Sequence, residues 1–293
     1  MASLISWKPI SKFTGSENTV IPVVRLQGTI AAGGSQLSQR INLASAAVPL
    51  QKAFSMKRSP AVAIIVNSPG GSPVQSSLIG KRIRALASEN DKKVLMFVED
   101  VAASGGYWIA CAGDEIYADP TSIVGSIGVV SGGFGFPEAL KKLGIERRVY
   151  TAGTRKAILD PFRPEVEDDI EHLKDLQRSM HEDFKAWVKE RRGDALADND
   201  DLFTGLFWTG RRAADLGLID GLGDLRAVLR ERYGEKMKLK VLNQKRAMFR
   251  GLGTSKLRAL LDGSADLEAV GGTLAADALN ALEDRAMWQR YGL

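Results

Sequence analysis

Apolar runs alternate with amphipathic segments along the first half of the chain. The run at 61–66 is continuously apolar and mostly β-branched, which predicts a strand buried on both faces, as in a parallel sheet. Other strand-like runs lie at 21–28, 93–98, 114–117 and 146–150. Helical patterns alternate with them at 37–56, 73–89, 105–112 and 137–143. This alternation predicts an α/β fold with mostly parallel strands.

The second half begins with one long amphipathic helix, predicted over residues 165–192. Its first turns are acidic and its last turns are basic, which suits the helix dipole. The two histidines of the chain, His172 and His181, both fall within it. Neither has glycine or turn residues beside it, so we interpret both as ordinary surface or packing residues.

A serine stands where the strand-like run at 93–98 gives way to a short apolar helix. Ser104 is followed at once by Gly105 and Gly106. Such a turn exposes a hydroxyl, directs backbone N–H groups toward a developing anion and lets a substrate approach closely. Serine is also a common helix N-cap, so the turn indicates a nucleophile only if a base and an oxyanion hole accompany it.

A glycine-rich turn, Asn-Ser-Pro-Gly-Gly-Ser-Pro at 67–73, follows the buried strand. Pro69 fixes one dihedral, Gly70 and Gly71 permit positive φ, and Ser72 can cap the next helix. The turn is either a plain strand-to-helix connection or an anion-binding nest that supplies half of an oxyanion hole.

A serine nucleophile needs a base, and with both histidines placed on a helix the alternative is a lysine held neutral by burial. Lys156 is the candidate, because it follows Gly153 and precedes Pro161 in a predicted loop. Catalytic groups commonly lie in such loops. From spacing alone, a solvated loop lysine is the other interpretation.

Five motifs occur in order along the chain, at 67–71, 104–110, 125–129, 156–162 and 207–223. With this set the chain resembles the signal peptide peptidase A family of serine–lysine proteases, in its short, single-domain form, over about residues 20–242. The resemblance implies a Clp-protease/crotonase-like fold, with stacked ββα units around a mostly parallel core sheet. It also implies catalysis without a metal or an organic cofactor.

The resemblance implies a role for each matched residue. Ser104 matches the nucleophile and Lys156 the general base. Gly71 and Gly105 match the positions whose backbone N–H groups form the oxyanion hole, and Ser126 matches a serine that hydrogen-bonds the lysine. The implied reaction is hydrolysis of unfolded or hydrophobic, signal-peptide-like peptides through an acyl-enzyme, with activity rising toward mildly alkaline pH.

The resemblance further implies a ring-shaped homo-oligomer, whose active sites combine Ser104 of one protomer with Lys156 of the next. We expect a polar lead-in over 1–20, a protease domain over 20–242 and a helical extension over 243–293.

Two other functions stay open. One is a crotonase-like acyl-CoA enzyme, which shares the two-amide oxyanion hole. The other is a membrane-associated pseudo-protease scaffold.

Composition narrows the setting of the protein. The only cysteine, Cys111, excludes an intrachain disulfide and is interpreted as a small buried helix residue. No apolar run is long enough to span a membrane and no signal peptide is seen, so a cytoplasmic or peripheral location is expected.

The formal net charge of +5 is concentrated late in the chain. The basic, amphipathic region 236–258 predicts peripheral contact with an anionic membrane surface. A solvated face or an inter-subunit contact is the alternative. No pattern indicates nucleic-acid binding.

Overall fold

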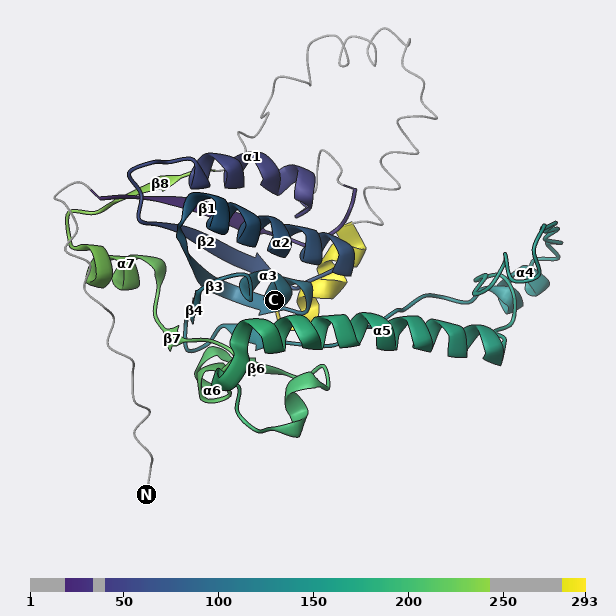
Figure 1. The fold of residues 1–293 in the computed structure, drawn as a ribbon. Coiled ribbons are helices and arrows are strands. Elements are labelled where there is room, and N and C mark those ends of the chain that lie inside the picture. The colour runs from purple at the N-terminus through teal and green to yellow at the C-terminus, as the bar shows by residue number, and fades with distance from the viewer. Residues whose placement is uncertain (1–18, 34–39, 243–280) are drawn as a thin grey trace, which may run out of the picture.

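The computed structural model describes residues 19–33, 40–242 and 281–293 (Figure 1). The predicted lead-in up to residue 18 lies outside these residues, as do positions 243–280 of the predicted extension and the end of the basic region. Within the described ranges, no helix is both long and apolar enough to cross a membrane.

One eight-stranded sheet forms the centre of the described chain. Its path runs β6-β5-β3-β2-β1-β8, and β4 pairs with β3 and β7. Every pairing is parallel except the one between β5 and β6. The strands are β1 (Val20–Gln27), β2 (Ala61–Ser68), β3 (Lys93–Ala103), β4 (Glu115–Ala118), β5 (Ile123–Gly125), β6 (Phe207–Thr209), β7 (Gly221–Leu222) and β8 (Lys238–Val241). The predicted α/β fold with a mostly parallel sheet is confirmed.

Helices cover both faces of this sheet. Alternate residues of a strand point to opposite sides, so a continuously apolar strand presents apolar side chains on both faces. Val62 and Ile64 of β2 pack in the cluster that also contains side chains of α1, α2, α3 and the end of α5. Ala63 and Ile65 pack in the second cluster, with α7. The helices are α1 (Leu43–Phe54), α2 (Pro73–Asn90), α3 (Gly105–Ala110), α4 (Pro137–Lys142), α5 (Glu167–Arg192), α6 (Gly210–Asp215) and α7 (Leu225–Tyr233).

Strand β3 positions the candidate serine. Its first half pairs with β4, and its second half pairs with β5 through Val101–Ala103. It therefore runs beyond β4 to the edge where β1, β2 and β5 also end. Loops after the carboxyl ends of parallel strands commonly form binding sites, and the turns after β2, β3 and β5 all lie at this edge.

Residues 129–166, here called the arm, extend away from the sheet beside the N-terminal half of α5 (Figure 1). Phe136 donates its backbone N–H to the Pro161 carbonyl, which closes the arm on itself. The strand predicted at 146–150 is wrong: these residues belong to no strand or helix, and Tyr150 is 90% exposed. No strand of the described chain pairs with these residues, and a strand needs such a partner for its backbone groups.

Candidate active site

Ser104 occupies a sharp turn between β3 and α3. Its backbone has φ +52° and ψ −121°, a strained conformation for a residue other than glycine. The Ser104 N–H donates to the Gly125 carbonyl at 2.8 Å, and its carbonyl accepts from the Trp108 N–H at 3.0 Å. Its side chain makes no capping hydrogen bond within the described residues. The turn thus holds the Ser104 backbone firmly and leaves the hydroxyl free, as a nucleophile requires.

The glycine turn after β2 lies against this serine turn. A Cβ atom built on Gly70 would stand 2.8 Å from the Ser104 Cβ and 3.0 Å from the Gly105 nitrogen. A Cβ on Gly105 would stand 3.4 Å from the Gly71 nitrogen. Only glycine permits this approach, so the two predicted oxyanion positions are neighbours in the fold.

The backbone around Gly71 is braced by Ile30, which follows β1. Ile30 donates to the Gly70 carbonyl at 2.8 Å and accepts from the Ser72 N–H at 2.7 Å. Among the described residues, the N–H groups of Gly71 and Gly105 have no hydrogen-bond acceptor. Two unused backbone donors beside a serine hydroxyl are what an oxyanion hole requires.

Ser126, in the turn after β5, lines the same cavity of about 290 Å³ as Ser104. Ser126 is only 5% exposed, has φ +55° and donates its N–H to the Leu206 carbonyl at 2.7 Å. Strands β5 and β2 pair with opposite edges of β3. The turn after β5 therefore faces Ser104 from the side opposite the glycine turn. No group of histidine, cysteine or acidic residues in the described chain is arranged to hold a metal ion.

Lys156 does not reach this cavity within one chain. It is exposed on the arm, where its N–H donates to the Gly153 carbonyl at 3.2 Å. The adjacent Arg155 donates to the Asp168 carbonyl at the start of α5. His181, which does line the cavity, is about 20 Å further along that helix. The structure brings together Ser104, Gly71, Gly105 and Ser126, and leaves Lys156 outside.

His181, interpreted from the sequence as a surface or packing residue, is part of the cavity wall. Its Nε2 lies 3.1 Å from the Ile127 carbonyl. Because a carbonyl can only accept, Nε2 carries the proton and is not available as a base in this arrangement. Phe184 and Val188, at i+3 and i+7, are buried on the same helix face, and this spacing is the sequence signal that places His181 inward.

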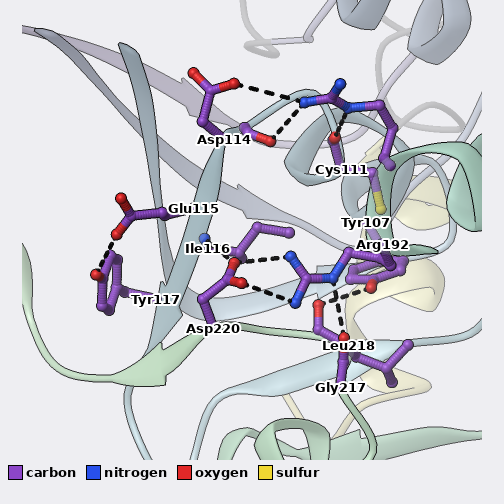
Figure 2. A network of polar contacts seen from close by, with 12 residues as sticks. Tyr107, Cys111, Asp114, Glu115, Ile116, Tyr117, Arg192, Gly217, Leu218 and Asp220 are labelled. Carbon is purple, nitrogen blue, oxygen red and sulfur yellow. Dashed lines mark hydrogen bonds and ion pairs between the residues drawn. The ribbon is translucent and has the colours of Figure 1, made fainter. Parts of the chain in front are cut away.

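A network of polar contacts anchors the far end of α3 (Figure 2). Arg192 at the end of α5 forms a bidentate ion pair with Asp220, with hydrogen bonds of 2.7 and 3.2 Å. It also donates to the Gly217 carbonyl. Tyr107 of α3 donates its hydroxyl to the Leu218 carbonyl at 2.7 Å. The network ties α3, and with it the Gly105 N–H, to the end of α5 and to the segment before β7.

Cys111 lies in this network and is fully buried. Burial raises the pKa of its thiol to about 12, so the thiol stays protonated near neutral pH. A buried, protonated thiol is not a nucleophile. This agrees with the interpretation of Cys111 as a small buried residue.

The buried Arg192–Asp220 pair leads to a prediction about stability. Asp220→Ala leaves the Arg192 guanidinium, whose side chain is 5% exposed, without its carboxylate partner. We expect the free energy of unfolding to fall by about 3 kcal/mol, measured by urea denaturation. Asp215→Ala, which breaks the exposed pair with Arg212, should change it by less than about 1 kcal/mol. Equal effects of the two changes would contradict the anchoring role.

The chain is similar in sequence to several known proteins. A putative protease, slr0021, of Synechocystis is 30% identical over 258 residues, which cover 85% of this chain and 89% of the relative. The putative protease MJ0651 of Methanocaldococcus jannaschii is 35% identical over 162 residues, or 55% of this chain and 51% of the relative.

A protein named Na(+)/H(+) antiporter NhaA, from Brucella abortus, is 59% identical over 277 residues. The match covers 94% of this chain but only 37% of the Brucella protein, so the chain spans little more than a third of that relative. The model of peptidase family S49 matches residues 87–240, which include Ser104, Gly105, Ser126 and Lys156. The chain therefore belongs to peptidase family S49, the signal peptide peptidase A family of serine-type peptidases.

Proposed function

We propose that the chain is a serine peptidase that hydrolyses peptide bonds through an acyl-enzyme on Ser104. The observation that carries this proposal is the strained Ser104 turn set against two unused backbone donors, the N–H groups of Gly71 and Gly105. The Ser104 Oγ attacks the peptide carbonyl carbon and the oxyanion rests on these two N–H groups. The C–N bond then breaks, and water releases the acyl group.

Lys156 of a neighbouring copy is the proposed base. In its neutral form it takes the Ser104 proton and passes it to the leaving amine. Three features support a neighbouring origin: Lys156 is exposed on the arm, no lysine lines the described cavity around Ser104, and Ser126 stands there with a hydroxyl that can hydrogen-bond an amine. Every active site is then completed if the protomers form a closed assembly, and a ring is the proposed form.

The arm also has the surface for such an assembly. Phe134 is 82% exposed, Leu143 72% and Tyr150 90%, an unusual apolar density for one projecting segment. A second copy of this chain would cover these side chains while it receives the lysine. The proposed substrates are unfolded or hydrophobic peptides, because a folded domain cannot enter a cavity of about 290 Å³. Membrane contact through region 236–258 stays a prediction.

Labelling with a serine-directed phosphonate tests the nucleophile directly. Intact-protein mass spectrometry should show one adduct, and peptide mapping should place it on Ser104. An adduct on another residue of the assembled protein, or none, would overturn the proposal.

Gly71 gives a prediction about the oxyanion hole. A Cβ atom there would stand 2.1 Å from the Ile30 carbonyl oxygen, at φ +137°. Gly71→Ala should therefore displace the Gly71 N–H and lower kcat by about 100-fold on a fluorogenic peptide. Gly132→Ala on the arm, where nothing lies within 4 Å of the new Cβ, should leave kcat unchanged. Full activity of Gly71→Ala would exclude this N–H as an oxyanion donor.

A further inference from the structure

The 281–293 segment lies across the carboxyl ends of the strands, at the site (yellow in Figure 1). Tyr291 is the one buried side chain among these residues and is 8% exposed. The ring packs against Val101 and Ala103 of β3. It meets Phe207 of β6 edge-on, with the ring centroids 5.0 Å apart. An aromatic side chain thus fills an apolar recess whose floor is the strand that ends at Ser104.

The hydroxyl of Tyr291 reaches both turns that flank Ser104. It lies 3.3 Å from the Ser126 Oγ and 3.5 Å from the Pro69 carbonyl. Pro69 belongs to the glycine turn, and Ser126 is the proposed partner of the incoming lysine. Arg290, the preceding residue, lines the same cavity as Ser104. The segment therefore occupies positions that substrate and lysine would need.

A second contact fixes this segment at the other end of the site. Thr29, which is 3% exposed, donates its hydroxyl to the Asp284 carboxylate at 2.8 Å, and Arg40 pairs with the same carboxylate at 3.5 Å. Thr29 precedes Ile30, the residue that braces Gly71. The segment thus crosses from the oxyanion side to the Ser126 side, with a part-buried contact at Asp284 and a buried contact at Tyr291.

We propose that the 281–293 segment is an internal ligand of the catalytic cavity, and that Tyr291 occupies a recess for an aromatic side chain of a peptide. Substrate and the neighbouring Lys156 then bind in competition with this segment. This inference rests on the proposed peptidase only for the identity of the competing substrate. The recess itself should bind any peptide with a well-placed aromatic residue. Only molecules in which the segment has withdrawn can bind another ligand. The apparent affinity for that ligand is therefore the intrinsic affinity multiplied by the fraction of such molecules.

Two measurements on full-length variants test the proposal. Tyr291→Ala should raise the rate of phosphonate labelling of Ser104 by about tenfold, because the ring no longer holds the segment in place. Tyr291→Phe keeps the ring and should fall between Tyr291→Ala and wild type. Leu282→Ala, at a 65% exposed position of the same segment, should label like wild type. If both proteins are labelled, equal rates for Tyr291→Ala and wild type, or a slower rate for the variant, would overturn the inference.

The second measurement does not depend on catalysis. A fluorescent peptide with the sequence of residues 284–293 should bind Ser104→Ala/Tyr291→Ala about tenfold more tightly than Ser104→Ala alone. Equal affinities would refute the internal ligand even if Ser104 labels normally. Tighter peptide binding with no labelling of any form would instead refute the peptidase and support the internal ligand. Thermal melting of each variant confirms that it is folded.

Discussion

Replacing Ser104 with alanine is expected to lower peptidase kcat by at least about 1,000-fold, because the acyl-enzyme can no longer form. The fold should be unaffected, since the Ser104 backbone makes the hydrogen bonds of the turn and its side chain caps nothing within the described chain. Cleavage of a fluorogenic peptide by the assembled protein gives kcat, and circular dichroism reports the fold.

Ser88→Ala is the matched control for Ser104, because Ser88 is an exposed serine of α2. This variant should keep wild-type kcat. Peptidase activity that survives Ser104→Ala would show that another nucleophile is responsible.

Lys156→Ala should lower kcat as severely as Ser104→Ala does, because the Ser104 proton then has no acceptor. The structure adds a sharper expectation, since Lys156 and Ser104 are apart within one chain. Lys156→Ala and Ser104→Ala proteins, each inactive alone, should regain about a quarter of wild-type activity when equal amounts are dissociated and reassembled together. In such a mixture, a serine from one variant meets a lysine from the other.

Lys142→Ala, at an exposed lysine of the same arm, is the control and should keep full activity in the homogeneous assembly. If mixing restores nothing, the serine and lysine do not come from different protomers. A fully active monomer, measured by light scattering with activity, would lead to the same conclusion.

Prediction from sequence was most successful where a segment is governed by its own residues. Strand β2 was predicted from its continuous apolar run, because a strand buried on both faces has only apolar neighbours. The turns at Gly71 and Ser104 were also predicted, since the preference of glycine and serine for turns depends on these residues and their immediate neighbours. Strands β5 to β8 have two to four residues each, too few for a periodic pattern.

One element was predicted wrongly, and one position was not anticipated, where distant segments decide the outcome. The residues at 146–150 have a strand-like pattern but no partner in the described chain. His181 enters the cavity wall because α5 packs against α3 and the Ile127 carbonyl, a contact between residues 54 positions apart.

The fold class, the serine turn and the glycine turn follow from local sequence, because burial patterns and backbone preferences are properties of neighbouring residues. Tertiary structure decided that the Gly71 and Gly105 N–H groups lie together, since only the parallel pairing of β2 with β3 brings their turns side by side. It also decided that Lys156 stands apart from Ser104 and that Tyr291 lies beside Ser126. These are contacts across the chain, and their geometry depends on how whole elements pack.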